Sequence, residues 1–346
     1  MTGRSLSLAV LHGGPSSEHD VSVITAREVL AALRGAGHRV DSVYVDREGL
    51  WHFNGQSGES GQTVPTPRPL PEALTQLVAM NPACAFLGFH GTYGEAGRIQ
   101  AALDLVGVAY SGSGVVASAV AMDKPLARRV LESAGIAVPP AVEVLTSQLQ
   151  DPTAISTTAD SLVEQLGSPT VVKVAAGGSS IGIEIPGDRD ALVETLTRLR
   201  GDSAVLLCEG FVTGVELTAA VLSRSDGSLE ALPVVEISPV GDRFFDYEAK
   251  YEPSLTDEIV PARITAEQES NARRIGLIAH RVLGCRAVSR TDMILDIQGR
   301  LQVLETNTLP GLTPASLLPK AAEAAGCDYV ELLHRIIRPS LSNQGD

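Results

Sequence analysis

The sequence predicts an α/β protein made of three units with mixed sheets. Short apolar runs typical of buried strands alternate along the chain with segments whose apolar residues have helical spacing. Domains of roughly 150 residues are usual, so a chain of 346 residues is expected to hold two or three of them. Apolar residues make up 44% of the chain and charged residues 20%, which supports a full hydrophobic core and excludes intrinsic disorder.

The first unit is expected to end near residue 112. Its predicted elements are a strand at 6–11, a helix at 22–34, strands at 40–45 and 84–89, a helix at 96–106 and a strand at 107–110. Gly35 is expected to end the first helix. The segment 54–72 is rich in Gly, Ser and Pro, and we expect a mobile surface insertion there.

The second unit begins near residue 122, and Pro125 suits the first turn of a helix that ends at Gly135. Three short strands follow, at 170–174, 181–185 and 204–208. The third unit has the same mixed character. Its predicted elements are strands at 217–222, 231–237, 293–297 and 301–305, a long helix at 265–283 and a final helix at 328–337.

The charge balance excludes some classes of partner. The chain has 27 Lys and Arg against 41 Asp and Glu, a net charge of −14, so no global positive field attracts nucleic acid or an acidic membrane. The sequence contains no run of 18 uninterrupted apolar residues, so it predicts no membrane span. The four cysteines are far apart and show no metal-ligand spacing, so reduced thiols are expected. We expect a soluble, cytoplasmic protein.

The segment Gly177-Gly178-Ser179-Ser180 lies between two β-branched runs. Two glycines and two serines in a hairpin can present consecutive backbone N–H groups and hydroxyls to an anion. An ordinary hairpin explains the same residues, and the segment alone does not separate the two interpretations. The sequence GxxxxGK[ST] occurs nowhere in the chain, which excludes a P-loop NTPase.

Asp292, Glu305 and Asn307 form the strongest candidate metal site. Residues i and i+2 of a strand face the same side, so Glu305 and Asn307 project together, and a hairpin partner would bring Asp292 alongside. Three hard oxygen ligands suit Mg²⁺ when substrate phosphates complete its shell. Solvated carboxylates on an exposed face are the alternative, although both strands are otherwise apolar.

Three further features are ambiguous. The turn 13–18 precedes a helix, and Glu18 there is either a ligand for an ammonium group or a partner of the helix dipole. His90 follows a strand and is expected to face a cleft, although a lone histidine is more often structural. The segment 112–117 matches GxGxxA, but Glu132, the acid at the required offset, falls inside a helix, so a dinucleotide site is disfavoured.

Taken together, seven segments resemble the motifs of the D-alanine–D-alanine ligase family of the ATP-grasp superfamily. They occur in family order over nearly the whole chain: LHGGPSSEHDVS (11–22), FHGTYGEAGRIQ (89–100), YSGSGVVASAVAMDK (110–124), VVKVAAGGSSIG (171–182), FFDYEAKY (244–251), RTDMILD (290–296) and LETNTLPGLTPASL (304–317). The resemblance implies an ATP-grasp fold of three α/β domains, with the nucleotide between the central and C-terminal domains. The implied domains are 1–112 on the first-substrate side, 113–212 with the Gly/Ser-rich loop, and 213–346 with the metal ligands and the second-substrate pocket.

The resemblance also implies the reaction and its participants. ATP phosphorylates the carboxylate of a first D-alanine, and the amine of a second attacks the acyl phosphate. D-Alanyl-D-alanine, a peptidoglycan precursor, leaves with ADP and phosphate. The implied cofactors are ATP and two Mg²⁺ ions, or Mn²⁺ in their place. The other implied partners are small molecules and a second copy of the chain, as a homodimer.

Residue roles are carried over from matching motif positions. Glu18 matches the residue that binds the first ammonium group, together with Ser179 and Tyr251, while Arg290 and the Gly311 amide match the oxyanion stabilisers. The substrate-pocket matches are His90, Ser316 and Leu317. The ATP-binding matches are Lys124, Lys173, Ser179, Ser180, Glu209, Glu216 and Lys250. The metal-ligand matches are Asp292, Glu305 and Asn307.

Some positions depart from the family pattern, namely Ala96, Val174, Ala176, Gly210 and Phe245. None is a phosphate or metal ligand, but they leave open a ligase for another amino-acid pair in a specialised or antibiotic pathway. Tyr251 matches enzymes that make a dipeptide, so an amine nucleophile is expected. A regulatory protein that binds nucleotide without catalysis is disfavoured, because Asp292, Glu305, Asn307 and Arg290 are present.

Overall fold

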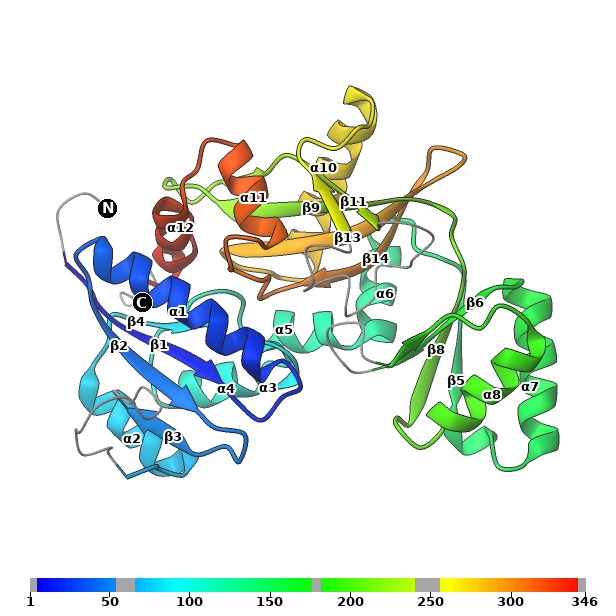
Figure 1. Ribbon diagram of the computed structural model, residues 1–346, viewed down its shortest axis with the longest axis horizontal. Coiled ribbons are helices and arrows are strands. Elements are labelled where there is room, and N and C mark those ends of the chain that lie inside the picture. The colour runs from blue at the N-terminus through cyan, green and yellow to red at the C-terminus, as the bar shows by residue number, and fades with distance from the viewer. Residues whose placement is uncertain (1–4, 54–65, 176–181, 240–255, 342–346) are drawn as a thin grey trace.

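The chain is described by a computed structural model that covers residues 5–53, 66–175, 182–239 and 256–341 (Figure 1). Three separate β-sheets organise it, each with its own helices. The sheets follow one another along the chain, as the alternation of apolar runs predicts. The exact boundaries of the three predicted domains stay a prediction.

The first sheet has the strand order β3-β2-β1-β4 and binds the N-terminal helices. Its strands are β1 (Ser7–Gly13), β2 (Arg39–Val45), β3 (Trp51–Phe53) and β4 (Cys84–Leu87). Strand β1 is parallel to both β2 and β4, so the carboxyl ends of these three strands meet at one edge. The accompanying helices are α1 (His19–Gly35), α2 (Leu70–Met80), α3 (Thr92–Glu95) and α4 (Arg98–Leu105).

The second sheet is antiparallel, with the order β5-β8-β6-β7. Its strands are β5 (Ala141–Leu145), β6 (Thr170–Val174), β7 (Ile183–Glu184) and β8 (Val205–Gly210). Helices α7 (Pro152–Leu166) and α8 (Arg189–Leu199) pack on it, at the right of Figure 1. The side chains of Asp151 and Asp188 cap these helices by accepting backbone N–H bonds of the first turn.

The third sheet has six strands in the order β12-β11-β9-β13-β14, with β10 paired to β9. Its strands are β9 (Gly214–Ser223), β10 (Leu229–Ala231), β11 (Val235–Pro239), β12 (Thr256–Ile259), β13 (Val288–Asp296) and β14 (Leu301–Asn307). The remaining helical elements are α5 (Val115–Met122), α6 (Lys124–Ser133), the 3-10 turn η1 (Thr146–Gln148), α10 (Ala266–Val282), α11 (Leu317–Ala324) and α12 (Tyr329–Leu341). Alternate residues of β9 serve two cores: Leu217 and Ala219 pack with α10, while Ala220 and Leu222 pack with α11 and α12.

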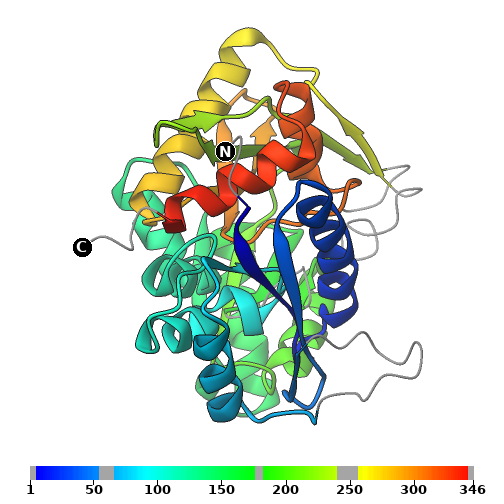
Figure 2. The ribbon, with the colours of Figure 1, turned by 90° about the vertical axis from the view of Figure 1, so that its left-hand side faces the viewer.

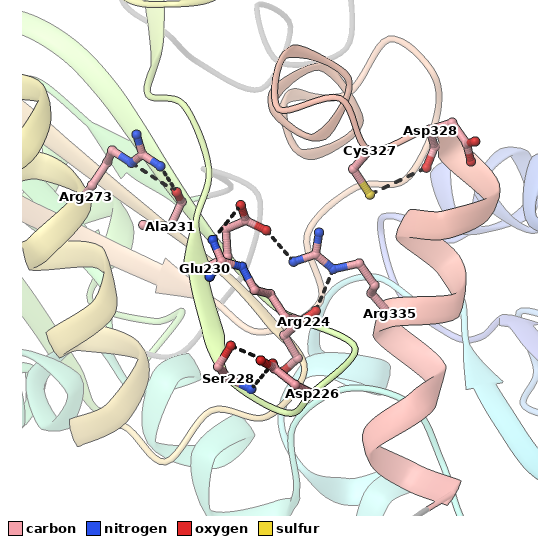
Figure 3. A network of polar contacts seen from close by, with 10 residues as sticks. Arg224, Asp226, Ser228, Glu230, Ala231, Arg273, Cys327, Asp328 and Arg335 are labelled. Atoms are coloured by element: carbon pink, nitrogen blue, oxygen red, sulfur yellow. Dashed lines mark hydrogen bonds and ion pairs between the residues drawn. The ribbon is translucent and has the colours of Figure 1, made fainter. Parts of the chain in front are cut away.

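Helix α12 joins the third sheet to the first. Its Leu332 and Ile336 share one core with Leu8 and Val29 of the first unit, and Figure 2 shows α12 beside the N-terminal strands and α1. Arg335, also on α12, is buried and donates to the Ser223 carbonyl at 2.7 Å and to Glu230 at 2.6 Å (Figure 3). The common core therefore holds the first and third sheets against each other, and the Arg335 contacts fix α12 on the third sheet.

The elements agree with the predicted ones in most places and differ in a few. Helix α1 begins at His19, not at residue 22, and the strand expected at 107–110 is a single bridge between Ala85 and Tyr110. Residues 70–72 of the expected insertion form the start of α2, while 54–65 lie outside the described residues. Sequence reasoning missed helices α2, α3, α5, α7, α8 and α11 and strands β3, β5 and β12. None of the helices in the described ranges combines the length and apolar character needed to cross a bilayer.

Candidate active site

A pocket lies between the second and third sheets, and residues from six strands line it. Its charged lining residues are Lys173 of β6, Glu209 of β8, Glu216 of β9, Asp292 of β13 and Glu305 of β14. Val171, Ile183, Phe211, Ile294 and Leu304 are among its apolar lining residues. A mainly apolar cleft with a few convergent charges is the usual form of a cofactor site. These five charged residues were assigned to ATP or metal from the sequence, and the structure brings them together.

One wall of the pocket carries a buried ion pair. Lys173 Nζ lies 2.5 Å from Glu209 Oε2, and both side chains are nearly buried. Arg128 of α6 approaches the other carboxylate oxygen of Glu209 at 3.8 Å. Breaking such a pair is costly, because a buried charge loses its partner. The Lys173 ammonium is therefore fixed in place at the pocket wall.

Lys124 lies at the start of α6, and its side chain lines a small adjoining cavity with Glu209 and Glu305. The Asp123 side chain caps the same helix by accepting the Leu126 N–H. The backbone N–H of Lys124 donates to the Ala175 carbonyl at 3.0 Å. Lys124 therefore lies directly beside the point where the chain leaves β6 for the Gly/Ser-rich segment.

The opposite wall is the β13–β14 hairpin. Asp292 faces Glu305 directly across the ladder, and Arg290 faces Asn307, so the predicted side-by-side arrangement is present. The register shifts between Asp292 and Met293, an irregularity typical of strands that aim side chains into a site. Arg290 donates to both oxygens of Asp292, at 2.9 and 2.7 Å. Two parallel hydrogen bonds between buried groups fix the plane of the guanidinium.

The oxygens on this hairpin fit a hard divalent cation. A carboxylate has about four acceptor positions, and Asp292 accepts from Arg290 on both oxygens and from the Thr218 hydroxyl on Oδ1. Asp292 lines the pocket, and its Oδ2, with one hydrogen bond from Arg290, has a further acceptor position. Within the described ranges no three His, Cys, Asp or Glu side chains gather to hold a metal. A cation here would thus need the Asn307 amide as well as Asp292 and Glu305.

Glu18 lies in a second region, at the carboxyl edge of the first sheet. Gly13 and Gly14 have φ of 84° and 91°, a conformation that favours glycine, and they turn the chain from β1 toward α1. The buried Ser22 hydroxyl accepts the Gly13 N–H and donates to the Gly88 carbonyl, both at 2.7 Å. Glu18 is only 3% exposed, and its carboxylate packs against Gly91. The carboxylate is thus held in place at this edge.

His90 lines a small cavity at the end of β4 and is almost wholly buried there, so its role in substrate binding stays a prediction. Its side chain is 5% exposed, with Nε2 at 3.1 Å from the Thr25 hydroxyl and Nδ1 at 3.8 Å from the Glu95 carboxylate. Thr25 of α1 and Glu95 of α3 close around the His90 ring, and the position of a residue at a strand end in the sequence cannot reveal such burial. Burial raises the pKa of Glu95, and the nearby charge of Glu18 adds to this effect.

The predicted second-substrate residues lie in the loop between β14 and α11. The Ser316 hydroxyl is 2.8 Å from the Thr313 hydroxyl, and Ser316 immediately precedes α11. A Cβ at Gly311 would come within 2.9 Å of Ser316 Oγ, so only glycine fits this close approach without a shift. Leu317 is buried in the core, so only its backbone is available at the loop. The loop brings Gly311 and Ser316 together.

Four predicted site residues, Ser179, Ser180, Lys250 and Tyr251, lie outside the described residues. Of the departures from the family pattern, Ala176 and Phe245 also lie outside them. A side chain at Gly210 would meet the Leu166 carbonyl at 3.2 Å, and Val174 packs against Gly182. Contacts with neighbouring residues therefore explain why glycine fits at position 210 and how the Val174 side chain is packed.

Sequence reasoning missed Arg128, Thr218 and Ser22, which position other site residues. Arg128 follows Lys124 by one helical turn and so lies on the same face of α6, a spacing that could have indicated it. Thr218 and Ser22 carry no comparable signal. Their roles depend on which strands become neighbours.

Two family models match the chain: "D-ala D-ala ligase N-terminus" at residues 7–113 and "D-ala D-ala ligase C-terminus" at residues 130–338. The chain belongs to the D-alanine–D-alanine ligase family. Family relatives include the D-alanine–D-alanine ligase of Leptospira interrogans, 35% identical over 96% of this chain and 98% of that protein. The D-alanine–D-alanine ligase of Halalkalibacterium halodurans is 36% identical over 97% of this chain and 99% of that protein.

Solved structures agree with this family membership. The D-alanine–D-alanine ligase of Bacillus anthracis, crystallised in complex with ATP, has a TM-score of 0.75 and 30% identity, with 98% of each chain covered. The VanG D-Ala:D-Ser ligase of Enterococcus faecalis has a TM-score of 0.76 and 25% identity, covering 97% of this chain and all of that one. The fold is accordingly the ATP-grasp fold of this family.

Proposed function

We propose that this chain is an ATP-dependent ligase that joins two D-alanines to D-alanyl-D-alanine and releases ADP and phosphate. The observation that carries the proposal is the convergence of Lys173, Glu209, Asp292 and Glu305 on one pocket, in a chain of this family. ATP use is supported by the ATP complex of the Bacillus anthracis relative. The product suits peptidoglycan precursor synthesis in the cytoplasm.

The first step moves the γ-phosphoryl group of ATP to the carboxylate of one D-alanine. Such transfers need positioning and charge neutralisation more than covalent help from the protein. Lys173, held by Glu209 at 2.5 Å, and Lys124 beside it supply fixed positive charge for the phosphates. Lys250, Ser179 and Ser180 are proposed to complete this set, and Glu209 and Glu216 to contact the adenosine.

Two Mg²⁺ ions, or Mn²⁺ in their place, are proposed to be held by Asp292, Glu305 and Asn307. When bound, such ions would supply positive charge that neutralises the negative charge of the nucleotide phosphates during transfer. The oxygen ligands described on the β13–β14 hairpin support this assignment. The chain's own contribution is the orientation of Asp292 by Arg290 and Thr218.

The second step joins the two amino acids. The amine of the second D-alanine attacks the acyl phosphate carbon, the C–O bond to phosphate breaks, and the amine loses a proton. Glu18 is proposed to bind the first ammonium group with Ser179 and Tyr251. Arg290 and the Gly311 amide are proposed to stabilise the oxyanion, because donors fixed before the reaction need no reorganisation.

His90, Ser316 and Leu317 are proposed to line the substrate pockets. His90 is buried, whereas Ser316 is partly exposed. The chain is proposed to act as a homodimer, with the domains 1–112, 113–212 and 213–346. Sedimentation velocity would measure the oligomeric state.

A ligase for another amino-acid pair is a second candidate, favoured by the likeness to the VanG D-Ala:D-Ser ligase. One assay separates the two. Purified protein with ATP and Mg²⁺ is given D-alanine, D-serine, D-lactate or L-alanine, alone and in pairs, and phosphate release is followed. The proposal expects D-alanine alone to support the highest rate. Preference for a mixed pair supports the second candidate, and no release above background contradicts both.

A further inference from the structure

We propose that His19 is a positioning residue for Glu18, acting by joining the Gly14 carbonyl to the Tyr44 hydroxyl. The inference rests on the proposed function, in which Glu18 binds the first substrate. The evidence for the inference does not come from the reaction. It comes from the contacts of His19 and Tyr44, to which the proposed reaction assigns no role. Both side chains lie at the carboxyl edge of the first sheet, where β1 turns into α1.

The hydrogen bonds of His19 fix its tautomer. Its Nδ1 is 2.8 Å from the Gly14 carbonyl, which can only accept, so Nδ1 carries the proton. In the neutral ring, Nε2 then accepts from the Tyr44 hydroxyl at 3.1 Å. The ring is 5% exposed and stands edge-on to the Tyr44 ring, with centroids 5.5 Å apart. His19 is therefore a bridge with both of its nitrogens in use.

This bridge ends on the peptide that sets the course of the turn. Gly14 adopts φ 91° and its carbonyl accepts from the Ser16 N–H at 2.9 Å as well as from His19. The Ser16 hydroxyl in turn accepts the Glu18 N–H at 3.2 Å and donates to the His90 carbonyl at 3.0 Å. A continuous chain of contacts thus runs from Tyr44 to the backbone of Glu18.

Histidine suits this position because the two ends of its ring face different partners. Asparagine can replace only the Nδ1–H donor toward Gly14, whereas glutamine places its amide nearer the position of Nε2. Leucine removes both contacts. If His19 had only a structural role, replacing it would lower the stability of the protein and would change the KM for D-alanine and the KM for ATP to the same extent. A positioning role affects the KM for D-alanine more than that for ATP, since Glu18 lies at the edge of the first sheet and is not among the residues that line the nucleotide pocket.

The test compares H19L, H19N, Y44F and the control H52L. His52 also packs against Tyr44, at 5.4 Å between ring centroids, but its Nε2 pairs with Asp46. H19L is expected to raise the KM for D-alanine about tenfold, the equivalent of one well-placed hydrogen bond, with the KM for ATP within about twofold of wild type. H19N, which keeps only the contact with Gly14, is expected to recover part of this loss. Y44F is expected to raise the KM for D-alanine less than H19L does, and H52L is expected to leave it unchanged.

Equal changes in both KM values, or H19N no better than H19L, would overturn the inference. If H19L does not fold, Y44F and a ¹⁵N NMR spectrum of the His19 ring still decide, because an Nε2–H tautomer would contradict the bridge. Failure of the proposed function looks different: the wild-type protein itself would form no ADP with D-alanine. In that case the ¹⁵N NMR spectrum, which reports the tautomer of His19, still tests its proposed hydrogen bonds.

Discussion

Replacing Gly91 with alanine would place a methyl group against the Glu18 carboxylate. An ideal Cβ at Gly91 lies 2.8 Å from Glu18 Oε2 and 3.2 Å from Ser16 Oγ, closer than a real Cβ normally comes to an oxygen. The backbone there has φ 72° and ψ −166°, a region that side-chain-bearing residues rarely adopt. The substitution therefore costs stability and also moves the proposed ammonium ligand.

A matched control separates these two effects. Gly167 has nearly the same backbone, with φ 82° and ψ −171°, but its ideal Cβ meets no other described atom within 4 Å. Each alanine variant is expected to lose about 1–3 kcal/mol of unfolding free energy from backbone strain. Only Gly91→Ala disturbs the Glu18 contact with the substrate, and a hydrogen bond to a charged group contributes about 1.5–3 kcal/mol. We therefore expect kcat/KM for D-alanine to fall about 10- to 150-fold in this variant.

The assay is steady-state ADP formation with varied D-alanine at saturating ATP, beside urea unfolding of both variants. Gly167→Ala should keep the wild-type kcat/KM at temperatures where it is folded. If Gly91→Ala also keeps it, or if both variants lose the same activity, the placement of Glu18 in the first-substrate site is refuted.

Three other perturbations test the two walls of the nucleotide pocket and the buried histidines. Lys173→Met should lower the free energy of unfolding by about 3 kcal/mol, because the buried Glu209 carboxylate loses its ammonium partner. Adding Glu209→Gln to this variant should restore part of the loss. If urea unfolding shows that the losses of the two single variants simply add in the double variant, the pairing is contradicted. Asp292→Asn should lower kcat about 100-fold, because the Arg290 guanidinium is no longer held by a carboxylate. Asp296→Asn, a control on the same hairpin, should leave kcat unchanged. Burial lowers the pKa of His12 and of His280 to about 4. As the pH falls, these histidines therefore become protonated in the unfolded chain before they do so in the folded protein. The free energy of unfolding should be highest above about pH 6.5 and should fall by ~3 kcal/mol per histidine as the pH is lowered to 4. Urea unfolding of His280→Gln should show a shallower pH slope, and an unchanged slope would disprove this cause.

The β13–β14 hairpin shows what a sequence can predict about this site. The alternation of residues along a strand places Glu305 and Asn307 together, and a short connection makes Asp292 their neighbour across the ladder. Both facts are local, so they could be predicted without knowing the rest of the fold. The roles of these residues came from the family motifs, which no spacing argument supplies.

Other features could not be predicted because they depend on distant segments. The burial of His90 needs Thr25 of α1 and the chain after β4 to close over it. The Arg335 contacts with Ser223 and Glu230 join residues more than a hundred positions apart. Helix α7 is different, because the capping Asp151 and the proline after it are a local start signal hidden in a polar stretch.

The most direct test of the proposed reaction follows an oxygen atom. D-Alanine labelled with ¹⁸O in its carboxylate is incubated with the protein, ATP and Mg²⁺, and the released phosphate is analysed by mass spectrometry. If the carboxylate attacks the γ-phosphorus and the acyl phosphate C–O bond then breaks, one ¹⁸O must leave with each phosphate. Unlabelled phosphate, or label carried by AMP, would contradict the acyl phosphate route.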